Sequence, residues 1–221
     1  MGWYRVGRSQ QNCNEEVIKM SAREFPDDVY EESCSRLPVP KREDLPEAAK
    51  EHYDYLHDPE GGTYAGIRGP GCIRLHSPEL LVRGIPVSRY VRYEAEIPVD
   101  VRELAILVTG RAFDSQFEWT AHEPAALMAG VPKPTLDIIR DRKATEGLPE
   151  AHDVIITLGR RLWEERKTVP KDLYKRAIEL WGPRMLVDIL WLMGNYAWTA
   201  SMIATFDIQV PLQKEPLLPA P

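Results

Sequence analysis

A carboxylate and an imidazole lie four residues apart in the segment FEWTAHEP, residues 117–124. In a helix, Glu118 and His122 share one face and can form a hydrogen bond, and Ser115 lies on the same face. A carboxylate beside an imidazole fixes its tautomer and stabilises its charged form, as proton transfer requires. The same spacing also occurs on solvated helices that have no chemical role. The segment is therefore a candidate catalytic site.

A second acidic residue, Glu103, lies upstream in the segment RELAIL, residues 102–107. The pattern Asp100-x-x-Glu103 is typical of a capping box at a helix N-terminus, so Glu103 has a structural interpretation as well as a chemical one. A metal site formed by Glu103, Glu118 and His122 would lack the second histidine of an HExxH motif. We therefore expect no bound metal.

The elements that position these residues are predicted to be helical throughout, with no strand. After residue 100, helices are expected at 101–111, 115–129, 135–143, 149–166, 170–180 and 183–206. Upstream, a helix at 45–58 precedes a glycine-rich loop at 61–71. Ser77 and Pro78 then begin a helix that Gly84 and Pro86 kink or split before it resumes through residue 93. The predicted fold class is all-α.

The chain divides into three parts by composition. Residues 1–44 are polar and proline-punctuated, which predicts an N-terminal arm. Residues 45–210 form the helical domain, and residues 211–221 form an extended, proline-rich tail.

The composition excludes several classes of protein. A net charge of −6 argues against binding to nucleic acid. The three cysteines, Cys13, Cys34 and Cys72, have no CxxC spacing. Residues 189–206 carry no charge but contain several polar residues and are flanked by aspartates, so a buried helix at the centre of an oligomer explains them better than a membrane span. The N-terminal residues form no apolar leader, so we expect a cytoplasmic protein.

The order of these motifs resembles the carboxymuconolactone decarboxylase-like family of the alkylhydroperoxidase D-like superfamily. The resemblance covers residues 45–210. It is carried by RELAIL, FEWxxHEP, a Gly-Val turn, the late apolar segment GNYAWTASM and the upstream segment LHSPEL. It implies an alkylhydroperoxidase D-like helical domain, assembled as a trimer or hexamer and working without a cofactor.

The peroxidase branch of that superfamily places two cysteines where this chain has Ser115 and Glu118. Thiol peroxidase activity requires a thiolate and a resolving cysteine, so we expect it to be absent. The remaining Glu103, Glu118 and His122 resemble the cysteine-free decarboxylase branch.

That branch implies a lyase that removes CO2 from a small carboxylated lactone or ring-derived acid in aromatic compound catabolism. His122 would donate a proton to the enolate, Glu118 would orient His122 and raise its pKa, and Glu103 would act as a second acid or base or position His122. The substrate-binding candidates are Ser115, Arg111, His76, Trp119, Tyr196 and Asn195. The same machinery also suits an isomerase, a hydratase or a retro-aldol enzyme, and the rival outside catalysis is an oligomeric binder of small molecules.

Overall fold

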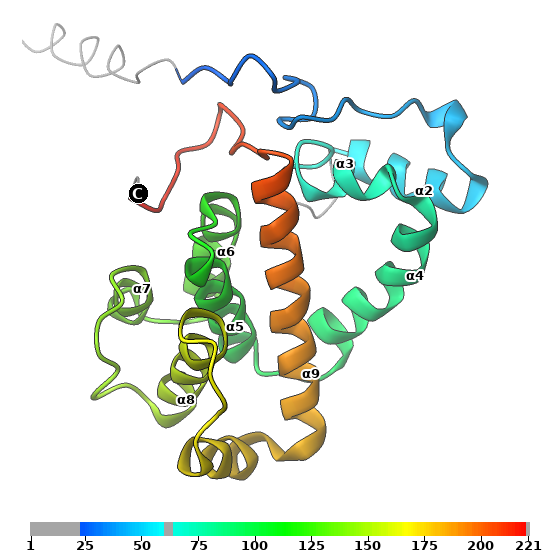
Figure 1. The fold of residues 1–221 in the computed structure, drawn as a ribbon. Helices are drawn as coiled ribbons and strands as arrows, with labels where there is room; N and C mark the ends of the chain where they lie inside the picture. The colour runs from blue at the N-terminus through cyan, green and yellow to red at the C-terminus, as the bar shows by residue number, and fades with distance from the viewer. Residues whose placement is uncertain (1–22, 60–63, 220–221) are drawn as a thin grey trace, which may run out of the picture.

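The computed structural model describes residues 23–59 and 64–219, and the regular structure within these ranges is helical (Figure 1). The β-structure of the described residues is limited to one isolated bridge between Tyr30 and Ser35. The predicted all-α fold class is confirmed.

Eight α-helices follow one another along the described chain. They are α2 (Glu47–His57), α3 (Pro70–Leu75), α4 (Pro78–Arg89), α5 (Val99–Ala112), α6 (Gln116–Met128), α7 (Lys133–Arg140), α8 (Glu150–Gly159) and α9 (Lys171–Thr205). Two of them continue into a single π-helical turn, Tyr90–Glu94 after α4 and Arg160–Glu164 after α8. Gly182, with φ of 66°, interrupts α9 next to Pro183, where the sequence predicts two separate helices.

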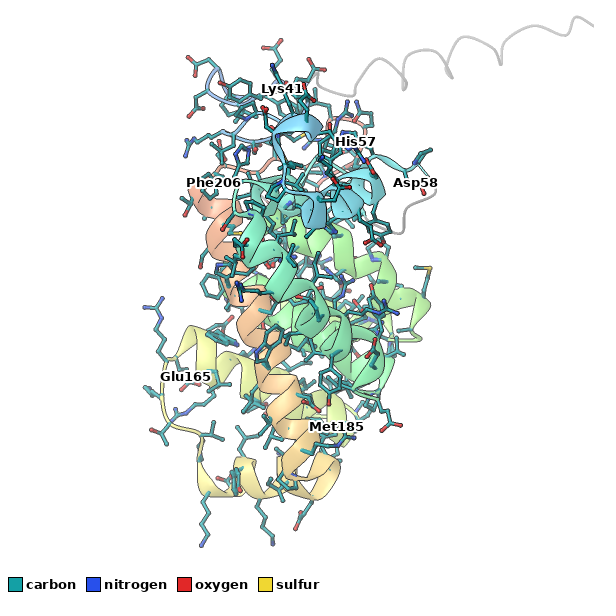
Figure 2. The ribbon with its side chains drawn as sticks, turned by 90° about the vertical axis from the view of Figure 1, so that its right-hand side faces the viewer. Lys41, His57, Asp58, Glu165, Met185 and Phe206 are labelled. Atoms are coloured by element: carbon teal, nitrogen blue, oxygen red, sulfur yellow. The ribbon has the colours of Figure 1, made fainter. Side chains whose placement is uncertain are left out.

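The helix α5 forms the centre of the main core and packs against α6, α8 and α9. In Figure 1, α9 stands between two groups of helices, with α5 to α8 on one side and α2 to α4 on the other. Figure 2 looks onto the second group, where α4 runs obliquely across that side of the molecule. Each group contributes residues that face α9.

Gly159 allows α8 to pack closely against α5. A Cβ atom on Gly159 of α8 would clash with both side-chain methyl groups of Val108 on α5 and would lie 3.0 Å from Cε of Met193 on α9. The absence of a side chain at residue 159 therefore allows three helices to meet at one point.

The predicted capping box is wrong. The helix α5 begins at Val99 with Pro98 as its N-cap, and Glu103 is buried one turn further on. The carboxylate of Asp100 pairs instead with Nε2 of His152 on α8, at 3.0 Å. Tertiary contacts occupy both acidic residues that the local pattern assigns to a cap.

Two further expectations about residues 61–93 need correction. The end of the predicted loop is already helical, because α3 begins at Pro70. The helix α4 is not split at Gly84 and Pro86, because it continues through both residues to the π-helical turn.

The described parts of the arm and the tail pack on the helical core. The backbone N–H of Arg36 donates to the carbonyl of Phe206, and that of Gln209 donates to the carbonyl of Cys34, both at 2.8 Å. The backbone N–H groups of Leu217 and Leu218 donate to side chains of α6, and Leu218 is buried in the main core. Residues 1–22 of the predicted arm lie outside the described residues.

None of the helices within the described ranges is long and apolar enough to cross a membrane. The uncharged stretch 189–206 instead buries one side against this chain, including Ile189, Leu192 and Met193.

Candidate functional site

A pocket of about 140 Å³ lies where α3, α4, the Tyr90–Glu94 turn, α6 and α9 meet. Its lining combines charged, hydroxyl, amide and aromatic groups, from Pro70, Arg74, Ser88, Arg92, Phe117, Glu118, His122, Asn195, Tyr196 and Thr199. Four of the predicted site residues, Glu118, His122, Asn195 and Tyr196, therefore line one cavity.

The imidazole of His122 is held by a carboxylate from the central helix. Its Nδ1 lies 2.8 Å from Oε2 of Glu103, which is 3% exposed and also pairs with Arg102 at 3.0 Å. Burial alone would raise the pKa of Glu103, but its hydrogen bond to His122 and the charges of His122 and Arg102 hold that pKa below its ordinary value. Glu103 is therefore a carboxylate that holds the His122 ring through Nδ1. The other ring nitrogen, Nε2, is not used in this contact.

The ring of Tyr196 supports the same imidazole from α9. The two rings meet edge to face, with centroids 5.1 Å apart and an interplanar angle of 87°. Burial raises the pKa of the Tyr196 phenol above its ordinary value, so its hydroxyl stays protonated. Tyr196 can therefore serve as a hydrogen-bond donor at the pocket wall.

The second acid of the pocket, Glu118, has a very different environment. Burial raises its pKa to about 8, and the Ser115 hydroxyl and the positive charge of Arg74 oppose this shift only in part. Neither carboxyl oxygen of Glu118 has a hydrogen-bond partner of regular geometry among the described residues. At neutral pH, Glu118 is therefore mostly a neutral carboxylic acid that can donate a proton or a hydrogen bond.

A glycine on α5 creates the space for that carboxyl group. A Cβ atom at Gly110 would lie 3.3 Å from Cβ and 3.4 Å from Oε2 of Glu118. Ser115 occupies the N-cap position of α6, where it is buried and does not line the pocket.

The prediction that Glu118 orients His122 is wrong. The two residues lie one turn apart on α6, as expected, but the partner of the imidazole is Glu103 on α5. The alternative that Glu103 positions His122 agrees with the observed geometry.

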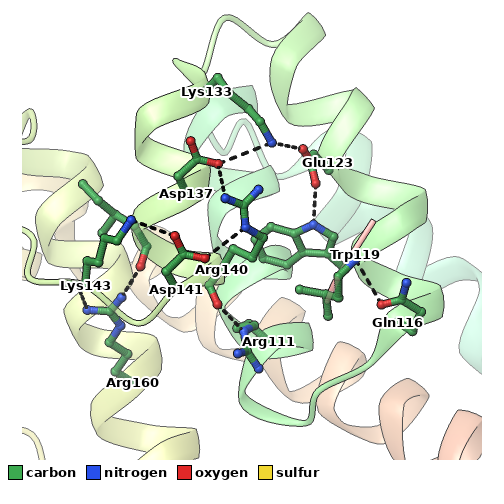
Figure 3. Close-up of polar contacts among 12 residues, drawn as sticks. Arg111, Gln116, Trp119, Glu123, Lys133, Asp137, Arg140, Asp141, Lys143 and Arg160 are labelled. Atoms are coloured by element: carbon green, nitrogen blue, oxygen red, sulfur yellow. Dashed lines mark hydrogen bonds and ion pairs between the residues drawn. The ribbon is translucent and has the colours of Figure 1, made fainter. Parts of the chain in front are cut away.

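The structure does not bring Arg111, Trp119 or His76 to the pocket. Figure 3 shows Arg111 and Trp119 in a separate polar network. Arg111 Nε donates to the carbonyl of Arg140 at 2.7 Å, and Trp119 is fully buried with its indole N–H on Glu123. The Nε2 atom of His76 lies 2.9 Å from the carbonyl of Pro38. These residues hold neighbouring segments together.

Sequence reasoning missed two arginines of the pocket, Arg74 and Arg92. Arg74 lies on α3, inside the apolar segment CIRL, and Arg92 lies in the π-helical turn after α4. A charged residue between Ile73 and Leu75, both of which are buried, was the available signal for Arg74. The sequence offered no such signal for Arg92, because this residue lies in a π-helical turn and regular α-helical spacing does not predict which way its side chain faces.

Among the described residues, no group of three or more His, Cys, Asp and Glu side chains is arranged to hold a metal ion. Cys34 and Cys72 are free, buried and outside the pocket lining. Burial raises the pKa of Cys72 to about 12, so it remains a thiol at neutral pH. Cys13 lies outside the described residues.

No family model matches the sequence, and searches of curated proteins and of solved structures give no significant match.

Proposed function

We propose that this chain is a cytoplasmic, cofactor-free lyase that removes CO2 from a small carboxylated lactone or ring-derived acid. The observation that carries the proposal is the pairing of His122 with Glu103 at 2.8 Å in the same pocket as a neutral Glu118. Two carboxyl groups whose surroundings separate their pKa values are typical of acid–base catalysis. The motif order and the resemblance to the decarboxylase-like family support the same reaction class.

The reaction begins when the substrate carboxylate leaves as CO2. The electron pair of the broken C–C bond moves into the ring and is delocalised onto the lactone carbonyl as an enolate. The neutral acid Glu118 and the hydroxyl of Tyr196 donate hydrogen bonds to the developing oxyanion, where preorganised donors are most effective.

Protonation of the enolate carbon completes the reaction. The His122 imidazolium donates its Nε2 proton to that carbon while Glu103, bonded to Nδ1, stabilises the charged ring. The neutral imidazole then takes a proton from solvent, which restores the starting state. Glu103 acts here as a positioning residue, because it contacts the imidazole rather than the substrate.

The size of the pocket supports a small substrate. An apolar cavity of about 150 Å³ is sufficient for benzene, and this pocket has a volume of about 140 Å³. The pocket volume therefore matches the ring of such a substrate, without its carboxyl groups.

Other reactions next to a carbonyl use the same groups. An isomerase, a hydratase or a retro-aldol enzyme would also need an imidazole held by a carboxylate and a neutral acid facing an oxyanion. A binder without turnover would need neither group, so the partly buried His122–Glu103 pair favours an enzyme.

We also propose that the chain forms a homo-oligomer, a trimer or hexamer, through α9. Four large apolar side chains lie exposed along one side of this helix: Val187, Leu190, Trp191 and Trp198. In Figure 1, no described segment covers the side of α9 that faces the viewer. A second copy of the chain would remove this apolar surface from water.

The test of the reaction is incubation of the purified chain with 4-carboxymuconolactone, with CO2 release and substrate absorbance followed together. His122→Ala should lower turnover by roughly 10²- to 10⁴-fold. His57→Ala is a matched control, because His57 is exposed and stacks on Tyr53 outside the pocket.

Unchanged turnover in His122→Ala would refute the role of His122. If the wild-type chain shows no turnover, the proposed decarboxylase reaction is refuted. Lactones and β-keto acids are then screened for hydrogen–deuterium exchange at carbon. A blank result in that screen would support the non-catalytic binder.

A further inference from the structure

Two guanidinium groups reach the pocket from separate elements. Arg74 on α3 donates from Nη2 to Oγ1 of Thr199 at 2.9 Å and lies over the ring of Trp198, 5.1 Å from its centroid. Arg92 lies over the ring of Tyr93, also at 5.1 Å. The aromatic rings and the hydroxyl hold both cations in place, yet none of these partners carries a negative charge.

The hydrogen-bonding capacity of both guanidinium groups is only partly used. The Nε atoms of Arg74 and Arg92 are both buried, and neither has a hydrogen-bond partner within residues 23–59 and 64–219. Among the described residues, no carboxylate lies within ion-pair distance of either group. The structure therefore contains two partly buried cations with N–H donors that no described residue satisfies.

The two acids closest to the site, Glu103 behind His122 and Glu118 in the pocket lining, do not balance these charges. The carboxylate of Glu103 is already shared between Arg102 and His122. Glu118 is mostly uncharged at neutral pH because of its burial. The Arg74–Arg92 side of the pocket therefore carries a net positive charge in the absence of a ligand.

A partly buried cation without a counter-ion is unfavourable, and an anion bound beside it offsets part of that cost. A carboxylate suits two guanidinium groups well, since its two oxygens accept the forked N–H donors of arginine. The neighbouring Phe117 and Tyr196 rings provide apolar surface for the rest of a small ring.

We propose that Arg74 and Arg92 form an anion subsite that binds a carboxylate of the substrate. The identification of the bound carboxylate as part of a substrate rests on the proposed function. Binding of an anion by the two arginines does not depend on turnover. Two cations stabilise a carboxylate against departure as neutral CO2. The carboxylate held by Arg74 and Arg92 is therefore one that stays on the molecule, and these arginines determine substrate specificity.

The test measures binding of unreactive probes to the full chain by isothermal titration calorimetry. Acetate and benzoate are the anionic probes, and benzamide is the neutral analogue of benzoate. Benzoate or acetate should bind the wild-type chain, and Arg74→Gln or Arg92→Gln should each weaken binding about tenfold or more, as expected for loss of a charged hydrogen bond. Benzamide should bind the wild type no better than the double variant.

Arg83→Gln is the matched control, because Arg83 is an exposed arginine of α4 that pairs with Glu79. It should bind benzoate as the wild type does. If a glutamine variant fails to fold by circular dichroism, Arg74→Lys and Arg92→Lys keep the charge and remove the forked donors. These lysine variants should still bind benzoate, more weakly than the wild type.

The outcomes separate the subsite from the reaction. If benzoate binding depends on both arginines but 4-carboxymuconolactone is not turned over, the subsite is supported and the proposed lyase activity is refuted. Turnover with an unchanged KM in both arginine variants overturns the subsite and keeps the lyase. The subsite is also overturned if neither anion binds the wild type, or if the double variant binds them equally well.

Discussion

Two glutamates of the site differ in protonation because their surroundings differ. Glu103 faces Arg102 and His122, which stabilise its negative charge, whereas burial beside Gly110 favours the neutral form of Glu118. The first is therefore suited to hold a charged imidazole and the second to donate from its neutral form. This division of roles follows from solvation and charge at each residue.

The pKa of Glu118 makes stability depend on pH. A pKa of about 8 in the folded state is higher than that of an unfolded glutamate, so the folded state holds the proton more tightly. This contribution is fully present below about pH 4 and is lost as the pH rises toward and through 8. The glutamine in Glu118→Gln does not titrate. The melting temperature of this variant, relative to that of the wild type, should therefore rise as the pH increases from 6 to 9.

Thermal unfolding of both proteins across this range, followed by circular dichroism, checks the prediction. Parallel curves for the wild type and Glu118→Gln would show that Glu118 has an ordinary pKa. Glu146→Gln provides a control, because Glu146 is an exposed glutamate in a loop.

The role of Glu103 as a positioning residue predicts a specific kinetic change. Glu103→Gln keeps the shape of the side chain but removes the charge that stabilises the His122 imidazolium. We expect kcat to fall, by less than in His122→Ala, with little change in KM because Glu103 does not contact substrate. Steady-state kinetics with circular dichroism as a folding control test this, and an unchanged kcat would contradict the assigned role.

At the scale of elements, a π-helical turn and a glycine contact shape the site. The turn Tyr90–Glu94 adds a residue to the helical repeat at the end of α4 and places Arg92 in the pocket lining. Gly159 lets α8 approach α5, the helix that supplies Glu103. Neither element contacts the reacting groups in the proposed mechanism, but both determine where those groups lie.

Gly159→Ala should destabilise the fold. The added methyl group overlaps the side chain of Val108 and crowds Met193, and overpacking of this kind costs about 1–3 kcal/mol. Gly84→Ala in α4 is the control, because its methyl group meets no atom within 4 Å and alanine favours a helix by about 0.5–1 kcal/mol. Urea unfolding of both variants gives the free energies of unfolding, and equal values would contradict the packing described.

At the scale of the whole molecule, α9 links the pocket to the exterior. One side of this helix contributes Asn195, Tyr196 and Thr199 to the cavity, while Trp191 and Trp198 lie about 40% exposed. Trp198 also stacks on Arg74. Assembly through α9 would therefore take place close to the pocket.

Trp191→Lys should weaken the proposed oligomer, because it places a charge in the exposed apolar stripe of α9. Tyr174→Lys is the control, since Tyr174 is exposed on α9 before the interruption at Gly182. Light scattering after size exclusion gives the mass of each protein. A wild-type chain with the mass of a monomer, or an unchanged oligomer in Trp191→Lys, would contradict assembly through this stripe.

Local sequence patterns were enough to predict the helical fold class, most of the helices and the candidate residues Glu103, Glu118 and His122. These features depend on local spacing: apolar periodicity predicts a helix, and residues four apart must share a face. The break near Gly182 and Pro183 was predicted for the same reason, because backbone restrictions act within a few residues.

Which of these groups meet depends on long-range packing, which local patterns do not contain. His122 pairs with Glu103 from α5 rather than with Glu118 one turn away, and the cations of the pocket are Arg74 and Arg92 rather than Arg111. The sequence places Arg111 near Ser115, but distance along the chain does not determine which side of a helix faces a cavity. That orientation follows from how α3, α4, α6 and α9 pack around α5, where close contacts between distant residues fix the rotation of each helix.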